Sequence, residues 1–473
     1  MANRERMAPA DAAFLHMDRP SNLMVVNAVM WFDSPPDWAL VRKVFQVRMV
    51  ERYPRFRQRP VDTGIAVGPF GAPHWEDDDT FSIDNHLHHR ALPAPGGQQE
   101  LQELIADLMA TPIDASKPLW HSYFIDGYGA GSAVLGRFHH CIADGIALAE
   151  VMLSLTDDAP DADIRVHRER SPERSSGLLA TVTAPAAAAA TVVGGAVASA
   201  RGAAEALLHE SRAVLANPDR LRELVGVGRA DVSALARVLL LPADSANVLR
   251  GSTGVAKRVA WSTSIPLADV KTAGRATGGT VNDVLLTALT GSVRNYLERR
   301  GSPVDEVRAL VPVNLRRPGA PLPRKLGNRF GLVFLALPVG LADRSERMAK
   351  LRARMDGLKR SPEGAVLFGI LNTIGLIPTQ VESVLVDILA TKGTMVVTNV
   401  PGPRQTVYLA GTPVAGVIAW VPASGDIGLG VSIFSYADRV FFGIASDAGI
   451  LSDPDSLVDE FERELTALLT SGG

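Results

Sequence analysis

The chain of 473 residues is too long for a single hydrophobic core, so two domains with a cleft between them are expected. A hydrophobic content of 47% and a formal net charge of −3 argue against a disordered protein and against a general nucleic-acid binder. The single cysteine, Cys141, excludes an intrachain disulfide and a multi-cysteine metal site, which fits a reducing compartment. The first ten residues hold three charges and no apolar stretch, so they predict no secretory signal and the protein is expected to be cytoplasmic.

Residues 1–155 are predicted to form the first domain. Runs of apolar and β-branched residues predict short strands at residues 24–32 and 134–140, and helical spacing of apolar residues predicts a helix at residues 100–109. Strands and helices also alternate in the second half of the chain. The fold class is therefore α/β or α+β.

Residues 156–252 are predicted to join the two domains. The segment opens with the acidic, proline-containing run 157–161, continues with a basic stretch at residues 165–174, and then becomes rich in Ala and Gly. Residues 175–200 carry no charge, but small residues dominate them and Pro185 interrupts them. We therefore expect an Ala-rich helix or a flexible crossover there, not a membrane span.

Residues 253–473 are predicted to form the second domain. Thr280 and Asp283 have the spacing of a capping box at the start of a helix. The uncharged residues 364–381 predict a buried or interface-facing helix, and the last two strands of the domain predict a hairpin around residues 436–439. Strands are expected at residues 307–313, 332–337, 395–398, 429–434 and 440–445.

The heptapeptide HHCIADG at residues 139–145 is the strongest indication of chemistry, and it lies on a predicted strand-to-helix turn. An imidazole titrates near neutral pH, so His140 can take a proton from a hydroxyl or thiol and later return it. If His139 and His140 end a strand, their side chains point to opposite faces. Only one of them can then face the cleft, and joint metal binding is geometrically awkward.

The carboxylate of this motif has several open roles. Asp144 could orient a histidine, pair with a nearby arginine, or cap the helix that begins there, and Gly145 lets the backbone turn. So short a pattern also arises by chance. The chain contains no G-X-S-X-G elbow, P-loop or dinucleotide-binding fingerprint, so a serine acyl-enzyme or a nucleotide cofactor is not supported.

Other polar clusters have a structural explanation beside a functional one. His86, His88 and His89 near Asp84 suggest a metal, but solvated polar residues are the favoured interpretation, and no metal is assigned. Arginines follow at four nearby positions and could attract a phosphate, although a solvated helix end explains them equally well. These arginines are Arg52, Arg55, Arg57 and Arg59.

Two further sites in the second half carry polar side chains. Asn282 and Asp283 could reach a cleft, yet helix capping alone accounts for their polarity. Asn399 precedes the sequence PGP at residues 401–403, which requires an irregular loop that either lines a pocket or only turns the chain.

Several ordered motifs cover nearly the whole chain. They are APADAAFL at residues 8–15, NLM at 22–24, FRQR at 56–59, PID at 112–114, KPLW at 117–120, HHCIADG at 139–145, TVNDV at 280–284, VPVNLR at 311–316, GNRFG at 327–331 and TNVPGP at 398–403. In this order they resemble the bacterial bifunctional wax ester synthase/diacylglycerol acyltransferases, a family of the CoA-dependent acyltransferase superfamily. The departures are mild: Cys141 stands where Ala is frequent, Ile113 replaces the usual Leu, and the Ala-rich linker is of a variable kind.

The resemblance implies two chloramphenicol-acetyltransferase-like domains with an active-site channel between them. It implies that His140 deprotonates the hydroxyl of diacylglycerol or a long-chain alcohol, which attacks the thioester of a fatty acyl-CoA directly; acyl-CoA is a co-substrate and no other cofactor is required. Asp144 would hold local geometry, Gly145 would permit close backbone approach, and His139 would be supporting. Residues expected to shape the substrate channel are Asn282, Asp283 and Asn399. Substrates this apolar imply peripheral association with the inner membrane face or lipid bodies.

Two other functions are compatible with the histidine motif. One is a carrier-protein-dependent condensation or polyketide-associated acyltransferase, against which the N-terminal motif and the TNVPGP segment argue. The other is a non-catalytic lipid-binding protein of the same fold, against which the intact His140, Asp144 and Gly145 argue.

Overall fold

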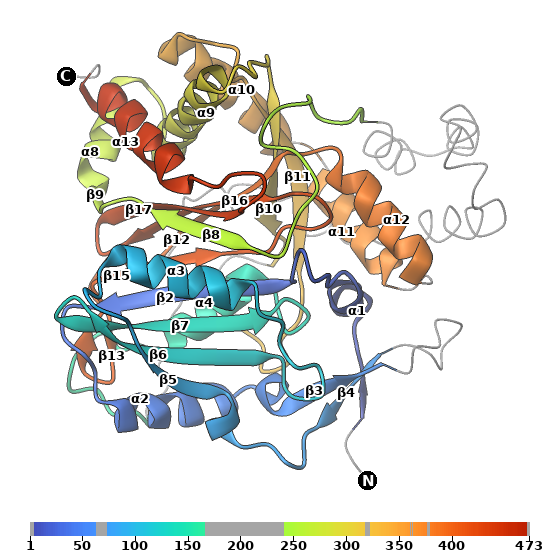
Figure 1. The fold of residues 1–473 in the computed structure, drawn as a ribbon, viewed down its shortest axis with the longest axis vertical. Coiled ribbons are helices and arrows are strands. Elements are labelled where there is room, and N and C mark those ends of the chain that lie inside the picture. Colours follow the sequence, from blue (N-terminus) through green and yellow to red (C-terminus); the bar gives the residue numbers. More distant parts are fainter. Residues whose placement is uncertain are drawn as a thin grey trace.

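The computed structural model has two lobes of mixed α/β structure, each built on a β-sheet with helices packed against it (Figure 1). The predicted Ala-rich crossover at residues 175–200, and most of the predicted linker 156–252, lie outside the described residues. The domain boundaries at 155/156 and 252/253 stay predictions. The described residues are 4–62, 73–165, 241–316, 322–359, 361, 363–375 and 379–470.

A five-stranded sheet with the order β15-β2-β7-β6-β5 forms the first lobe. The strand β7 is the central strand of this sheet and is buried at every position, including the polar Ser132, Arg137 and His139. The strands expected at residues 24–32 and 134–140 are confirmed, although β7 ends one residue early and leaves His140 on the following turn. The strands are β2 (Val25–Phe32), β5 (Leu87–Ala91), β6 (Trp120–Tyr128), β7 (Gly131–His139) and β15 (Gly416–Trp420).

Four helices and a small sheet complete this lobe. The helix expected at residues 100–109 is confirmed and begins slightly earlier, where the carboxylate of Glu100 accepts a hydrogen bond from the backbone N–H of Gly97 at 2.7 Å. The helices are α1 (Pro9–His16), α2 (Trp38–Val44), α3 (Gln98–Met109) and α4 (Gly145–Ser154), with a π-helical turn at Phe45–Val50 and 3₁₀ turns at Pro54–Arg57 and Ile83–Asn85. The small sheet joins β1 (Glu5–Arg6), β4 (His74–Asp77) and β3 (Gln58–Val61).

A seven-stranded sheet forms the second lobe, in the order β11-β10-β12-β16-β17-β8 with β9 beside β17. The helices α8, α9, α10 and α13 pack over it at the top of Figure 1. The strands are β8 (Lys257–Trp261), β9 (Ile265–Pro266), β10 (Val307–Asn314), β11 (Phe330–Leu337), β12 (Met395–Pro401), β16 (Leu429–Tyr436) and β17 (Arg439–Asp447). The helices are α8 (Leu267–Ala276), α9 (Val281–Arg299), α10 (Arg344–Lys359) and α13 (Pro454–Thr470); a two-stranded ribbon is formed by β13 (Tyr408–Leu409) and β14 (Thr412–Pro413).

Local signals in the second half predicted its elements well. The capping box is present: the hydroxyl of Thr280 accepts from the N–H of Asp283 at 3.2 Å, and the Asp283 carboxylate accepts from the N–H of Thr280 at 2.8 Å. The expected hairpin is the β16–β17 pair, which closes at the partners Tyr436 and Arg439. Each of the strands predicted in this half has its counterpart in the sheet.

Two helices replace the single helix expected at residues 364–381. They are α11 (Glu363–Ile374) and α12 (Thr379–Ala390). Between them, a Cβ added at Gly375 would lie only 1.8 Å from the carbonyl oxygen of Pro9 on the neighbouring helix α1, so this close approach requires glycine. The uncharged stretch therefore forms the first helix and only the beginning of the second.

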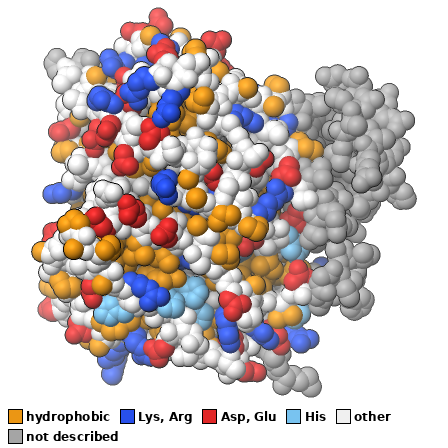
Figure 2. Space-filling model, in the orientation of Figure 1, with side chains coloured by type: hydrophobic (Ala, Val, Ile, Leu, Met, Phe, Trp, Pro, Cys, Tyr) orange, Lys and Arg blue, Asp and Glu red, His pale blue; other side chains and the backbone are white. Residues whose placement is uncertain are grey.

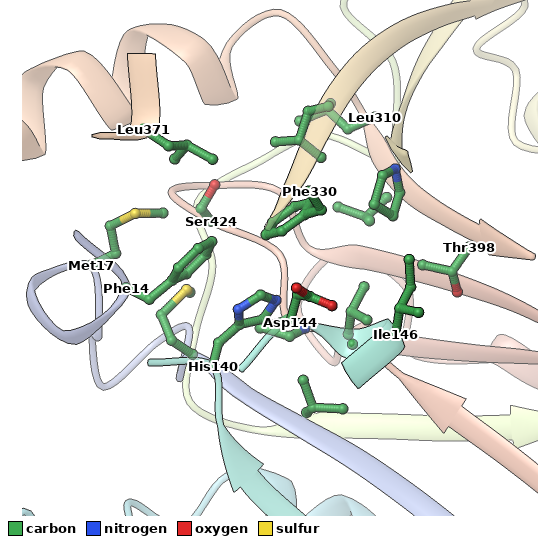
Figure 3. A pocket seen from close by; sticks show the side chains of 18 of the residues that line it. Phe14, Met17, His140, Asp144, Ile146, Leu310, Phe330, Leu371, Thr398 and Ser424 are labelled. Atoms are coloured by element: carbon green, nitrogen blue, oxygen red, sulfur yellow. The ribbon is translucent and has the colours of Figure 1, made fainter. Parts of the chain in front are cut away.

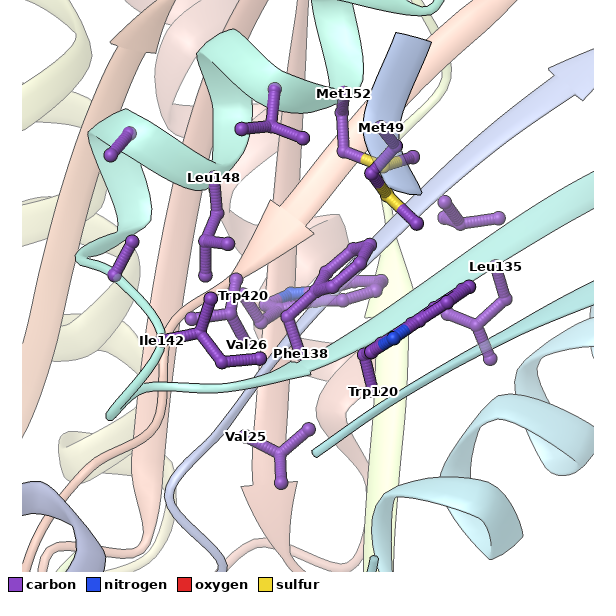
Figure 4. Packing of buried hydrophobic residues seen from close by; sticks show 14 of the residues in the cluster. Val25, Val26, Met49, Trp120, Leu135, Phe138, Ile142, Leu148, Met152 and Trp420 are labelled. Atoms are coloured by element: carbon purple, nitrogen blue, oxygen red, sulfur yellow. The ribbon is translucent and has the colours of Figure 1, made fainter. Parts of the chain in front are cut away.

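The strand β15 comes from the second half of the sequence but lies in the sheet of the first lobe. It pairs antiparallel with β2, with Gly416 opposite Trp31 and Trp420 opposite Asn27. Figure 4 shows the Trp420 side chain in the first-lobe core beside Phe138 and Val26. The predicted second domain, residues 253–473, therefore contains a strand that belongs to the sheet of the first lobe.

The surface carries charges of both signs. Acidic and basic side chains are interspersed over the face shown in Figure 2, with apolar side chains between them. None of the described helices is long and apolar enough to cross a membrane.

The strand exchange can be tested at its tightest contact. A Cβ at Gly416 would lie 2.0 Å from the Trp31 ring, so Gly416→Ala should lower the free energy of unfolding by about 1–3 kcal/mol through overpacking. The control is Gly357→Ala in α10, where a Cβ meets nothing within 4 Å and helix propensity should raise stability by about 0.5–1 kcal/mol. Denaturant unfolding measures both, and equal stability of the two variants would contradict the packing argument.

Candidate active site

A largely apolar cavity of about 1220 Å³, its open mouth included, lies between the two lobes. Side chains from α1, β2 and α4 line it on one side, and side chains from β10, β11, β12, α11 and α12 line it on the other (Figure 3). Four lining residues carry polar side chains: His140, Asp144, Thr398 and Ser424. Two members of the predicted motif thus face the same apolar space.

Backbone hydrogen bonds on both sides hold His140 at the cavity. Its N–H donates to the carbonyl of Met24 at 2.6 Å, and its carbonyl accepts from the side-chain amide of Asn328 at 2.7 Å. The imidazole stacks on Phe14 with ring centroids 4.1 Å apart and lies 5.4 Å from the ring of Phe330. The ring is therefore held between aromatic side chains from the two lobes (Figure 3).

Burial controls the protonation of His140. The residue is only 4% exposed, and its Nδ1 has no hydrogen-bond partner among the described residues. Desolvation lowers the pKa of His140 to about 4, although the nearby negative charge of Asp144 partly opposes the shift. The imidazole is thus neutral at physiological pH and can accept a proton.

His139 does not line the cavity, but strand alternation is not the reason, because β7 ends at His139 and His140 lies on the following turn. Its Nδ1 accepts a hydrogen bond from the N–H of Cys141 at 3.2 Å, and its Nε2 lies 3.7 Å from the carboxylate of Asp18. These contacts tighten the turn after β7, and a supporting role for His139 stays a prediction.

Asp144 combines two of the roles that were open. Its carboxylate caps α4 by accepting from the N–H of Ala147 at 3.0 Å, and it pairs with the guanidinium of Arg316 at 2.9 Å. It also accepts from the N–H of Arg329 at 2.9 Å. Burial raises the pKa of Asp144, but the charge and hydrogen bonds of Arg316 outweigh it and leave the pKa below its ordinary value. No hydrogen bond joins Asp144 to His140 or His139 within the described ranges.

Arg316 is the residue that sequence reasoning left without a role. It ends the VPVNLR motif just after β10, and its guanidinium also donates to the carbonyl of Gly327 at 2.9 Å. The signal in the sequence was an arginine two residues after the end of the largely apolar strand β10. Its partner could not be read from the sequence, because Asp144 lies 172 positions away. Gly145 is also confined, since a Cβ there would lie 2.8 Å from Val421.

The predicted polar residues of the second half do not line the cavity. The capping explanation holds for Asp283, which bonds Thr280. It is wrong for Asn282, whose side-chain oxygen instead accepts from the side-chain amide of Asn399 at 2.9 Å. That buried pair joins α9 to β12, next to the lining residue Thr398, so an influence on the channel stays a prediction.

The expectation of solvated histidines is wrong for two of the three residues. His86 is 1% exposed and its Nδ1 bonds the carbonyl of Trp120 at 2.8 Å, while His88 is half-buried with its Nε2 2.9 Å from Nδ1 of His121. Burial lowers the pKa of His86 and of His88. Only His89 is exposed, where it pairs with Asp126. In the described part of the chain, no group of three or more His, Cys, Asp or Glu side chains is placed so that it could hold a metal ion.

The solvated-arginine interpretation also fails at one position. Arg55 is 5% exposed, donates to the side chain of Gln58, and lies over the ring of Trp75 at 4.8 Å from its centroid. The strong burial comes from the small sheet of β1, β3 and β4, which packs over this turn. Arg55 is therefore a structural side chain.

Comparison with known proteins identifies the family. Residues 7–285 match the model of the wax ester synthase/diacylglycerol acyltransferase catalytic domain, and residues 326–469 match the C-terminal domain model of the same family. The chain belongs to the wax ester synthase/diacylglycerol acyltransferase family. It is an acyltransferase of lipid metabolism.

Relatives in this family match over nearly the whole length. A Mycobacterium tuberculosis protein named probable diacylglycerol O-acyltransferase Tgs1 is 31% identical over 97% of this chain and 94% of its own. The solved wax ester synthase/diacylglycerol acyltransferase from Marinobacter aquaeolei VT8 superposes with a TM-score of 0.68 at 21% identity, covering 99% and 100% of the two chains. The first condensation domain of the CDA synthetase gives a TM-score of 0.60 at 16% identity, covering 99% and 96%. The structural matches show the shared two-lobed fold.

The Arg316–Asp144 pair should carry more stability than a surface ion pair. Arg316→Met leaves a buried carboxylate without its cation, so the free energy of unfolding should fall by about 3–5 kcal/mol. The control is Arg300→Met, which removes a partner of the half-exposed Asp453 and should cost about 1 kcal/mol or less. Denaturant unfolding measures both, and a loss at Arg316 no larger than the control would show that the pair does not hold the lobes together.

Proposed function

We propose that this family member transfers a long-chain fatty acyl group from acyl-CoA to the hydroxyl of diacylglycerol, and also to long-chain alcohols, with His140 as the general base. The observation that carries the proposal is a neutral, buried imidazole in an apolar cavity between the lobes. Membership of the family supports the acyl-CoA donor and the lipid acceptor.

The proposed reaction is a direct transfer between two bound substrates. The imidazole of His140 takes the proton of the acceptor hydroxyl while the hydroxyl oxygen attacks the thioester carbonyl carbon of the acyl-CoA. The C–S bond then breaks, the ester is released, and the imidazolium returns the proton to the CoA thiolate. Holding both substrates in one cavity replaces a bimolecular encounter in water.

The cavity chemistry favours an uncharged base and an apolar substrate. Of the residues that line the cavity, only His140, Asp144, Thr398 and Ser424 carry polar side chains, and the remaining walls are apolar. Cys141 is an unsuitable nucleophile because burial raises the pKa of its thiol well above the ordinary value and the residue does not line the cavity. Such apolar substrates also support the proposal of peripheral attachment to a membrane or lipid body.

The activity is tested with purified protein, radiolabelled acyl-CoA and a panel of acceptors containing diacylglycerol and hexadecanol. We expect labelled neutral lipid, and His140→Ala should lower kcat by about 100- to 10,000-fold because the base is lost. His89→Ala, on the exposed edge strand β5, is the matched control and should keep full activity. Undiminished turnover by His140→Ala would refute the mechanism. Turnover with acyl-carrier protein but not with acyl-CoA would favour a condensation-type enzyme. Lipid binding without any product would favour a non-catalytic binding protein.

The pH dependence tests the state of the base. Free enzyme is active when His140 is neutral, and its pKa is lowered from 6.5 to about 4. As the pH falls, kcat/KM should therefore stay flat through 6.5 and decline only as the pH nears the lowered pKa. Circular dichroism at each pH serves as the folding control. An acid limb centred at 6.5 or above would contradict a buried, neutral imidazole.

A further inference from the structure

A buried carboxylate on α1 is linked through Asn328 to the turn that carries His140. Asp11 is 2% exposed, and its Oδ1 accepts two hydrogen bonds from Asn328, one from the backbone N–H and one from the side-chain amide, both at 2.9 Å. The same amide nitrogen donates to the carbonyl of His140 at 2.7 Å. We propose that Asp11 is a positioning residue for His140 and acts through the side-chain amide of Asn328. The inference rests on the proposed role of His140 as the base.

The His140 carbonyl needs this partner because it lies beyond the strand ladder. The strand β7 ends at His139, so the peptide group after His140 has no neighbouring strand to bond it. Its carbonyl oxygen is buried with the residue, and the amide of Asn328 is the donor that reaches it. Loss of that donor would leave the carbonyl unsatisfied and free the peptide to rotate. Rotation of this peptide would move the imidazole within the cavity.

Asp11 determines which way the Asn328 amide points. The amide nitrogen has two hydrogens, and here one is directed to Asp11 and the other to His140. In the flipped orientation the amide oxygen would face two acceptors, the Asp11 carboxylate and the His140 carbonyl. That arrangement is repulsive in a buried site. Without the carboxylate, the amide would have only one partner to hold its orientation.

The helix α1 acts on His140 at a second point. Phe14 lies three positions after Asp11, so the two side chains share one face of α1. Phe14 stacks directly on the His140 ring at 4.1 Å. A single helical turn therefore contacts the base twice, on its ring through Phe14 and on its carbonyl through Asp11 and Asn328. The spacing of Asp11 and Phe14 makes α1 the element that aligns the base with the cavity.

To orient the Asn328 amide, residue 11 must supply a hydrogen-bond acceptor, and both protonation states of Asp11 do so. Burial raises the pKa of Asp11 to about 7, against the opposing hydrogen bonds from Asn328. A neutral carboxyl with its proton on Oδ2 can still accept at Oδ1. A neutral amide at position 11 can accept in the same way. The hydrogen-bond geometry, and not the charge, should therefore decide activity.

Three variants separate the relay from simple anchoring of α1. Asn328→Ala removes the link to the His140 carbonyl but keeps the backbone N–H that bonds Asp11, so α1 stays anchored. We expect kcat to fall about 10- to 100-fold in Asn328→Ala and in Asp11→Ala, with KM for acyl-CoA unchanged, because misplacement of a catalytic group by about 1 Å costs this much. Asp11→Asn keeps the acceptor and should retain kcat within about threefold, with the same acid limb as the parent enzyme.

A double variant and a control complete the experiment. The kcat of the double variant Asp11→Ala/Asn328→Ala should be no lower than that of the less active single variant. The reason is that both residues act through the same hydrogen bond, from the Asn328 amide to the His140 carbonyl. The control is Asp447→Ala, another buried carboxylate that bonds Gly254 and Lys257 away from the cavity. It should lower the unfolding temperature and keep kcat at temperatures where it is folded.

The outcomes distinguish this inference from the proposed function. Full kcat in Asn328→Ala would overturn the relay and leave Asp11 with anchoring alone, and a dead Asp11→Asn would overturn the acceptor argument. In both cases, loss of activity in His140→Ala would still support His140 as the general base. Full activity in His140→Ala would instead remove the proposed function itself.

Discussion

Two carboxylates of the first lobe accept hydrogen bonds from consecutive backbone N–H groups of the second, and the cavity depends on this clamp. Asp11 holds Asn328 and Asp144 holds Arg329, each at 2.9 Å. Both carboxylates are buried, so separating the lobes here would leave polar groups unsatisfied on both sides. Phe330, the next residue, is thereby brought against the His140 ring at 5.4 Å.

The clamp supports a site in which burial and reactivity are linked. Enclosing His140 among aromatic and aliphatic side chains lowers its pKa and makes it a weak base that is always neutral at physiological pH. The same enclosure strengthens electrostatic interactions within the cavity, and the lowered pKa means that the protonated imidazole gives up its proton readily. The negative charge of Asp144 partly opposes the lowering of the His140 pKa, and its carboxylate also caps α4. Arg316, from the second lobe, neutralises part of that charge.

Elements from the second half of the sequence complete the first lobe and close the cavity. The strand β15 extends the first sheet, and Val421 and Pro422, which follow it, line the cavity beside Gly145. The helices α11 and α12 supply apolar side chains to the cavity wall, and α11 packs against α1. Gly375, directly after α11, lies so close to Pro9 at the start of α1 that a side chain would not fit between them. Neither lobe therefore encloses the substrate space by itself.

Sequence alone determined the features that depend on neighbours along the chain. Apolar spacing predicted the strands, the Thr280 capping box follows from a three-residue interval, and the ordered motifs indicated the family and the candidate base. Tertiary structure decided which distant groups meet: Asp144 with Arg316, 172 positions apart, and Asn282 with Asn399, 117 apart. It also turned His86 and Arg55 from expected surface residues into buried ones. The reason is physical, because local hydrogen bonds and periodicity are set by adjacent residues, whereas burial and long-range pairing are set by how the two lobes pack.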